Sequence, residues 1–193
     1  LRRLSLEGAA SEACLAAAEL AIKVSGAVQA ARWTTIADGT GYIYSFNGPH
    51  SLFADTVRSC RAVVLSHLLG HFLLTEGDRR INLLHRAVEH LTNNSRYNVY
   101  FGKGRDLYDQ RGRVAHESLF NINNGTYRCP STQQGYSPFS TWTRGLSWVI
   151  LGYAEQLEFF SSLPEKELKS AGGRKTILDL LKETATATAD FYL

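Results

Sequence analysis

Apolar residues recur at helical spacing in five stretches of the chain, which predicts a mainly helical protein. The predicted helices run from Glu12 to about Val28, from Ser51 to near Gly77, from Asp78 through Leu91, from Thr143 to Phe160 and from Arg174 to the end of the chain. Ser51 or Asp55 is expected near the start of the second helix, and Asp78 is expected to cap the third.

Short extended segments and polar loops separate these helices. The expected extended segments are Tyr42–Phe46, Tyr97–Phe101 and a hairpin of Val114–Phe120 with Tyr127–Cys129. The hairpin surrounds Asn124-Gly125, the residue pair that most strongly favours a short β-turn. Strands and helices do not alternate regularly, which argues against a parallel α/β sheet and predicts an all-α fold with a small β-hairpin.

Composition narrows the class of protein. Of the 193 residues, 44% are hydrophobic, which is enough to form a core. The chain has 21 basic and 18 acidic residues, and this excess of positive charge is too small to indicate nucleic acid binding. We expect no membrane segment, because no apolar run approaches the roughly 20 residues needed, and no signal peptide. A cytoplasmic protein is expected, with the periplasm as the alternative. The chain lacks Met and ends at Leu193 inside an apolar-periodic stretch, which favours a portion of a longer protein.

The cysteine and histidine patterns favour no metal site. Cys14, Cys60 and Cys129 are widely spaced, form no CxxC pair and are odd in number, so small buried hydrophobes and one exposed thiol are expected. His67 and His71 have the spacing of a zinc peptidase motif, but Leu68 stands where that motif has Glu. We therefore expect neither a metal nor an organic cofactor. His85 and His90 are expected on a solvated helix face.

Asp55 is a candidate for acid–base chemistry. It follows the Gly48-Pro49 loop and Phe53 at the start of an apolar helix. Two interpretations stay open: a carboxylate stabilised by the helix dipole, or a general acid whose pKa is raised by aromatic neighbours.

Polar and aromatic residues also gather before the Thr143 helix. Gln134, Trp142, Arg144 and Trp148 lie within fifteen positions, and Arg144 and Trp148 are four residues apart on one helix face. Ring faces, amides and a guanidinium group are what a sugar-acid site needs. His116, in the predicted hairpin, is either a packing residue or part of that site.

The segment Thr141–Trp148, followed by Leu151-Gly152-Tyr153-Ala154, resembles the Ser-Trp-Ala-Arg-Gly-Gln-Ala-Trp signature of the unsaturated glucuronyl hydrolases. Gly41–Phe46 and Asp55–Arg58 look like the loop and catalytic Asp segment of that family. His116 and Gln134 stand where its substrate-binding His and Gln precede the signature. The resemblance covers about residues 41 to 160.

The resemblance implies an (α/α)6 toroid of antiparallel helical hairpins, of which residues 1–193 would be one catalytic-type helical domain forming part of the barrel. It implies removal of a 4,5-unsaturated uronic acid from lyase-generated oligosaccharides by hydration of the C4–C5 double bond. Asp55 would be the general acid and base, without a cofactor. The substrate-binding residues would be Phe46, His116, Gln134, Trp142, Arg144 and Trp148.

This chain departs from the family pattern at three points. A second Asp in a His-Asp segment is absent, Leu146 and Ser147 replace Gln-Ala, and the stretch between Asp55 and His116 is longer than usual. Two other classes therefore remain: a carbohydrate-binding helical domain without turnover, and a sugar epimerase or isomerase that relies on His67, His71 and His116. The polysaccharide, the linkage and the oligomeric state are beyond the sequence.

Overall fold

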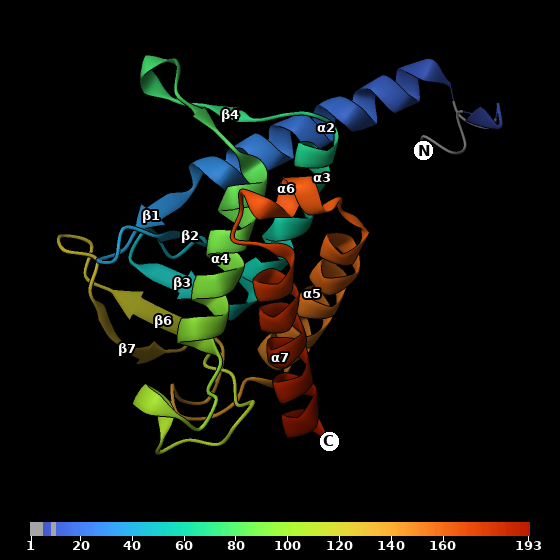
Figure 1. Ribbon diagram of the computed structural model, residues 1–193. Helices are drawn as coiled ribbons and strands as arrows, with labels where there is room; N and C mark the ends of the chain where they lie inside the picture. Colours follow the sequence, from blue (N-terminus) through green and yellow to red (C-terminus); the bar gives the residue numbers. More distant parts are fainter. Residues whose placement is uncertain (1–5, 9–10) are drawn as a thin grey trace.

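In the computed structural model, which describes residues 6–8 and 11–193, the chain is built mainly from helices (Figure 1). They are α2 (Glu12–Ala31), α3 (Cys60–Leu68), α4 (Leu83–Asn98), α5 (Thr143–Ser162), the short α6 (Glu165–Lys169) and α7 (Arg174–Tyr192). Helix α7 packs along α5 and contacts α4, and α3 packs between α2 and α4. Helices α4, α7 and α5 stand side by side, and α2 lies across their upper end.

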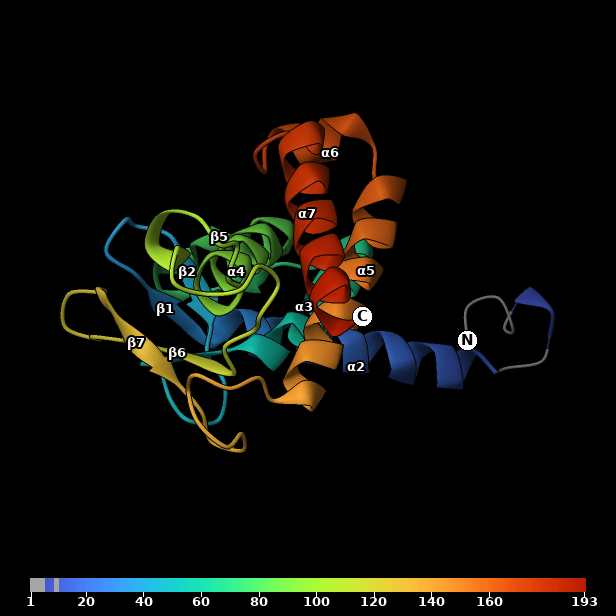
Figure 2. The same ribbon diagram turned by 90° about the horizontal axis from the view of Figure 1, so that it is seen from below.

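Three small antiparallel sheets accompany the helices. Strands β1 (Trp33–Thr35) and β2 (Gly41–Ile43) form one, and β4 (Leu73–Leu74) and β5 (Arg80–Ile81) form another. The third has the order β3 (Ser51–Phe53), β6 (Glu117–Phe120) and β7 (Tyr127–Ser131). Figure 2 shows that the β6–β7 hairpin projects on the side of the molecule away from α5 and α7.

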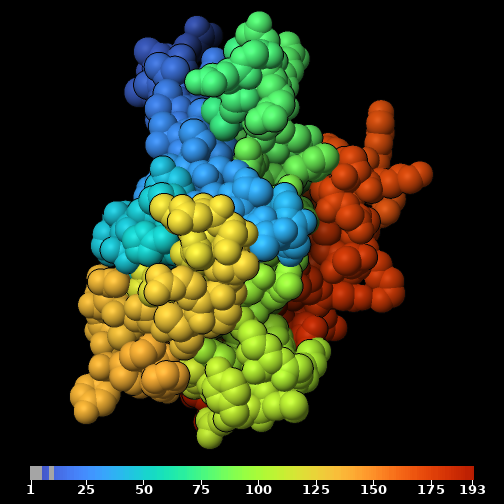
Figure 3. All heavy atoms as spheres, turned by 90° about the vertical axis from the view of Figure 1, so that its left-hand side faces the viewer, coloured from blue at the N-terminus to red at the C-terminus, as the bar shows by residue number. Residues whose placement is uncertain are grey.

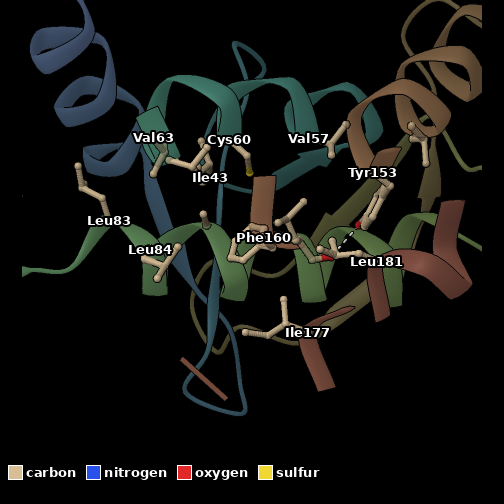
Figure 4. Packing of buried hydrophobic residues seen from close by; sticks show 14 of the residues in the cluster. Ile43, Val57, Cys60, Val63, Leu83, Leu84, Tyr153, Phe160, Ile177 and Leu181 are labelled. Carbon is tan, nitrogen blue, oxygen red and sulfur yellow. Dashed lines mark hydrogen bonds between the residues drawn. The ribbon is translucent and has the colours of Figure 1, made fainter. Parts of the chain in front are cut away.

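The main core lies where α3 and the 3-10 segment before it meet α4, α5 and α7. Figure 4 shows Val57 and Cys60 above Phe160, with Tyr153 entering from α5 and Leu181 from α7. All five are buried, and the Tyr153 hydroxyl donates a hydrogen bond to the carbonyl oxygen of Leu91 at 2.7 Å. The core therefore joins the segment that follows β3 to three helices at once.

Several sequence predictions are confirmed. The helix from Glu12 continues to Ala31, the helix from Thr143 to Ser162, and the last helix begins at Arg174. The hairpin around Asn124-Gly125 is also present. Gly125 has a φ of +70°, and a Cβ there would come within 2.5 Å of the Ala37 nitrogen, so only glycine suits this turn.

The second predicted helix is wrong at both ends. Ser51 lies in β3, paired with β6, and a 3-10 segment η1 (Ala54–Ser59) comes before the α-helix. Helix α3 ends at Leu68 because the chain turns at Gly70, whose φ is +80°. Gly77 then lies in the turn between β4 and β5. The apolar pattern continued past the helix because this hairpin also has apolar residues.

The third helix starts later and ends later than expected. Asp78 has a φ of +54° in the β4–β5 turn, and Asn82 is the cap instead, its Oδ1 accepting from the Leu84 nitrogen at 2.8 Å. The expected strand Tyr97–Phe101 is wrong, because α4 continues to Asn98 and Val99 makes only an isolated bridge with Val114.

The expectation that no segment is long and apolar enough to cross a membrane is wrong for α2. Its 20 residues meet that criterion by length and composition, with a mean hydropathy of 1.3 and 11% of the window buried. Such a helix near the N-terminus is weak evidence for a membrane span, since the core helix of a soluble protein or a signal sequence passes the same test.

Candidate active site

Asp55 lies in the first turn of η1, directly after β3. Its side chain is half-buried, and the Oδ1 atom is fully enclosed and has no hydrogen-bond partner among the described residues. Burial raises the pKa of the Asp55 carboxyl above its ordinary value and outweighs the opposite effect of its own backbone N–H, Arg58 and Arg144. The N-cap position of η1 is Phe53, so Asp55 is an acidic residue within the first turn and not the capping residue.

Buried amides on α4 fix the backbone that leads to Asp55. The Asn94 Nδ2 donates to the carbonyl oxygens of Phe53 at 3.0 Å and Ala54 at 3.3 Å. The Asn98 Nδ2 donates to the carbonyl oxygens of Leu52 and Ala115, both at 3.1 Å. These bonds satisfy strand carbonyls that would otherwise be buried and unpaired. The position of Asp55 is therefore set by side chains about 40 residues away.

The aromatic candidates form one continuous row of rings that includes Phe53, two residues before Asp55. Phe46 packs on Phe53 with 5.2 Å between ring centroids, and Phe53 meets the His116 ring edge-on at 4.9 Å. His116 lies 4.2 Å from Trp142, and Trp142 lies 5.3 Å from Trp148 at an angle of 90°. Phe46 itself is 72% exposed and ends the row at the surface. The structure thus brings together residues from four separate segments.

His116 is held in one neutral form. Its Nδ1 accepts a hydrogen bond from the backbone N–H of Gln133 at 3.2 Å and lies 2.9 Å from the Thr132 hydroxyl. Because an N–H points at Nδ1, the proton of the neutral ring is on Nε2. Burial lowers the pKa of His116 more than the nearby Glu117 raises it, and Arg144 lowers it further. His116 can therefore donate from Nε2 near neutral pH.

Arg144 links the row of rings to Gln134. Its guanidinium carbon is 4.6 Å from the centroid of Trp142 and 5.6 Å from that of Trp148. One terminal nitrogen donates to the Gln134 Oε1 at 2.6 Å, and the residue is exposed. Arg144 also acts electrostatically on Asp55, so positive charge faces the acid. This arrangement suits a carboxylate bound next to a proton donor.

Asp55 also lines a cleft of about 540 Å³. Its lining includes Ser25, Gln29, Arg32, Tyr44, Arg58, Arg61, Leu151 and Glu155. The Arg58 guanidinium carbon lies 4.8 Å from the Trp148 ring centroid, so Arg58 touches both the cleft and the row of rings. Sequence reasoning missed Arg58 as a separate site residue, although its place one turn after Asp55 was the available signal.

Glu117 is a second residue that the sequence analysis missed. Its carboxylate is fully buried and accepts from Asn47 at 2.7 Å, from Ser51 at 2.5 Å and from Gln133 at 3.1 Å. Burial alone would raise the pKa of Glu117, but these bonds together with Ser131 hold it below its ordinary value. The ionised carboxylate ties the Phe46 loop, β3 and the Gln134 loop together. Figure 3 shows this face, where the cyan segment lies against the yellow hairpin.

The other candidate histidines lie apart from this site. His67 and His71 do not share a helix, since α3 ends at Leu68, and the His67 Nε2 lies 3.1 Å from Glu167 of α6. His90 is wholly buried and not on a solvated face as expected. Its Nδ1 accepts from the Ile43 nitrogen at 3.0 Å. No group of three or more metal-ligating side chains occurs among the described residues.

The cysteines also differ in part from expectation. Cys60 is buried in the core, whereas both Cys14 and Cys129 are exposed, so there are two accessible thiols in place of the expected one.

Over the matched part, the fold is similar to that of solved unsaturated glucuronyl hydrolases. The chain superposes on a UGL variant together with dGlcA-Glc-Rha-Glc with a TM-score of 0.58 and 19% identity, covering 88% of this chain and 38% of that chain. For the unsaturated glucuronyl hydrolase of Bacillus sp. GL1 the TM-score is 0.57 at 19% identity, with the same coverage. For that of Streptococcus agalactiae it is 0.53 at 17% identity, with 84% and 35% covered.

The present chain thus spans 38% of the length of the first two of these structures. No protein-family model matches the sequence, and no curated protein matches it at a significant level. The similarity is therefore one of fold, and the chemistry has to be argued from the residues of the site.

Proposed function

We propose that the chain is part of a glycoside hydrolase that removes a 4,5-unsaturated uronic acid from lyase-generated oligosaccharides. The observation that carries the proposal is Asp55, a desolvated carboxyl with an unpartnered oxygen that is under the positive charge of Arg58 and Arg144. Arg144 in turn stacks on Trp142, which contacts the His116 ring. The fold it shares with unsaturated glucuronyl hydrolases supports the same reaction class. The site residues would act within a longer (α/α)6 toroid, in which residues 1–193 form one part.

In this reaction Asp55 is the general acid. Burial raises the pKa of the Asp55 carboxyl, which favours the protonated form that can donate its proton to C4 of the enol-ether double bond. Water then adds to C5 and gives its proton to the Asp55 carboxylate. The resulting hemiketal opens to a ketone, and the hemiacetal left at C1 releases the remaining sugar. Asp55 returns to its protonated form, so the step needs no cofactor.

The neighbouring residues bind and orient the sugar. Arg144 would receive the uronate carboxylate, since its guanidinium is exposed and stacked on Trp142 and Trp148. Gln134 holds Arg144 and can bond a hydroxyl, while Trp142 and Trp148 offer ring faces to the sugar. His116 would hold a sugar hydroxyl or the attacking water through Nε2, and Phe46 would border the entrance.

The test uses the full-length protein and a panel of unsaturated disaccharides made by different polysaccharide lyases. Turnover is followed as loss of the ultraviolet absorbance of the double bond. Wild type should remove the absorbance from at least one substrate, and Asp55→Asn should slow this at least about 100-fold. Asp179→Asn, an exposed carboxylate on α7, is the matched control and should keep full activity.

The two remaining classes predict different results. A carbohydrate-binding domain would bind the disaccharides without loss of absorbance. An epimerase or isomerase would tolerate Asp55→Asn and lose activity with His116→Gln. Either outcome in a folded protein would reject the hydration mechanism.

A further inference from the structure

A second cavity, of about 550 Å³, is lined by the β4–β5 hairpin, the first turns of α4 and Trp33 of β1. No residue lines both this cavity and the cleft at Asp55. In Figure 1 the hairpin projects above β1, on the same side of α4. The hairpin belongs to the stretch between Asp55 and His116, which is longer than in the family pattern. The resemblance to that family therefore assigns no role to this cavity.

Three arginines from two segments line the cavity: Arg79 and Arg80 of the hairpin, and Arg86 of α4. No hydrogen bond or ion pair with residues 6–8 or 11–193 engages any of the three guanidinium groups, and the Arg86 Nε is fully enclosed. Burial lowers the pKa of Arg86, the nearby Glu89 raises it, and Arg79 lowers it again. Like charges thus repel one another here, and a bound anion would relieve that repulsion.

Two of the three guanidinium groups are oriented by aromatic rings. The Arg86 guanidinium carbon lies 3.8 Å from the centroid of Trp33, and that of Arg80 lies 4.4 Å from the centroid of Phe72. The Trp33 ring is itself fixed, because it packs so closely on Gly41 that a Cβ there would collide with it. Stacking occupies the flat face of a guanidinium group and leaves its N–H edge to donate hydrogen bonds. These donors are therefore oriented before a ligand arrives.

Glu89 adds one carboxylate to the same cavity. It is half-buried and lies three positions after Arg86, on the same face of α4. A carboxylate can accept a hydrogen bond from a hydroxyl group, whereas it repels a small inorganic anion. The first amides of α4 offer nothing further, because the Asn82 Oδ1 already accepts from the Leu84 and His85 nitrogens. The cavity thus suits a ligand that has both an anionic group and a hydroxyl group.

We propose that this cavity binds a phosphate or sulfate ester carried on a sugar, with the ester oxygens on the three arginines and a sugar hydroxyl on Glu89. A tetrahedral ester group presents three outer oxygens, enough for donors that come from two segments. A volume of about 550 Å³ accommodates one sugar with its ester group. The site lies apart from Asp55 and does not depend on the reaction proposed there.

The test is calorimetric titration of the full-length protein with glucose 6-phosphate, glucose 6-sulfate and glucose. At least one ester should bind, and glucose should not. Arg79→Gln and Arg80→Gln should each weaken ester binding at least about tenfold, and both residues are exposed, so the fold should tolerate the change. Arg111→Gln removes the same charge from an exposed ion pair with Asp190 and should have no effect. The ester that binds more tightly identifies the group.

Inorganic phosphate and inorganic sulfate test the role of Glu89. In the wild type, the bound ester should have a lower Kd than the inorganic anion of the same kind. Glu89→Gln removes the repulsion of both ligands and weakens the bond to the sugar hydroxyl, so the ratio of the two Kd values should fall toward one. An unchanged ratio would overturn the assignment of the hydroxyl to Glu89.

Arg144→Gln separates this cavity from the site at Asp55. If an ester binds at the cavity, its affinity should be the same in Arg144→Gln as in the wild type. The proposal is overturned if ester binding is lost in Arg144→Gln and kept in Arg79→Gln and Arg80→Gln, because the ester would then bind at the other site. It is also overturned if neither ester binds, or if glucose binds as tightly as the esters do.

Discussion

The half-buried carboxyl of Asp55, proposed as the general acid, also affects the stability of the fold. Folding raises its pKa above the ordinary value of 3.8. At a pH above the raised pKa, the carboxyl is ionised in the folded protein, and its burial destabilises the fold. Below pH 3.8 the carboxyl is protonated in both the folded and the unfolded protein, so this destabilisation disappears.

Asp55→Asn should therefore stabilise the protein near pH 7 while removing turnover. We expect the Tm to rise by a few degrees at pH 7 and the gain to shrink toward zero as the pH falls below 4. Thermal unfolding of both proteins at the two pH values measures this. An equal rise in Tm at both pH values would mean that ionisation of Asp55 is not the cause.

The charge of Arg58 also affects the titration of Asp55. Its positive charge lowers the pKa of Asp55, so Arg58→Gln should raise that pKa. If Asp55 acts as the acid, activity falls as the pH rises through this value, and the falling limb should move to higher pH in the variant. The pH dependence of kcat/KM checks the direction. If the falling limb does not move, Arg58 does not affect the pKa of the catalytic acid.

Glu117 shows the opposite shift. Its pKa is lowered by four hydrogen bonds, so its contribution to stability is present above the ordinary value of 4.5 and is lost as the pH falls through the lowered value. Glu117→Gln would turn an amide NH2 toward Asn47 or Gln133, which are donors. We expect a loss of about 1–3 kcal/mol in urea unfolding at pH 7. Glu158→Gln, exposed on α5, should change stability little.

At the scale of elements, α5 and η1 approach closely at Gly152. A Cβ at this position would lie 2.6 Å from the Cγ1 of Val57, closer than real contacts allow. Because η1 carries Asp55 and α5 carries Trp148, the small residue sets the distance between the acid and its binding partners.

Gly152→Ala should therefore lower both stability and turnover, although alanine favours helices. We expect a loss of about 1–3 kcal/mol in denaturant unfolding. The double variant with Val57→Ala removes the opposing methyl groups and should recover most of the turnover. Failure to recover would place the defect elsewhere than in this contact.

Prediction from sequence succeeded where the information was local. The Asn124-Gly125 hairpin and the helices of Thr143 and Arg174 follow from turn chemistry and apolar period, and they are present. Ser51 was misplaced because its strand exists only through pairing with β6, which is far along the chain. Tyr97 was misplaced for a related reason, since packing extended α4 beyond its weak local pattern.

The site residues also fall into those that the local sequence predicts and those that depend on contacts between distant segments. Trp142 and Arg144 were visible as neighbours in the sequence, and the structure shows them in contact. Glu117 and Arg58 gain their meaning only when β3, β6 and α5 are assembled, since their partners lie in other segments.

At the scale of the whole molecule, α2 stands out by its exposure. Leu20, Val24 and Val28 lie on one face and are 60%, 52% and 52% exposed. In the chain of residues 1–193, Leu20→Ser with Val28→Ser should change the free energy of unfolding by less than about 0.5 kcal/mol. Denaturant unfolding of this chain and of the full-length protein compares the two. A much larger loss only in the full-length protein would show that this face is covered there.

The amides of α4 affect how the protein can be produced. Asn93-Asn94-Ser95 has the acceptor pattern for N-linked glycosylation, yet Asn93 is buried and donates to the Gly41 carbonyl oxygen at 2.7 Å. A second acceptor pattern, Asn124-Gly125-Thr126, lies in the hairpin turn, where Asn124 is exposed. Passage through a eukaryotic secretory pathway would set glycan transfer to Asn93 in competition with folding, and a chain modified there could no longer close α4 against β2. Bacterial expression avoids that competition.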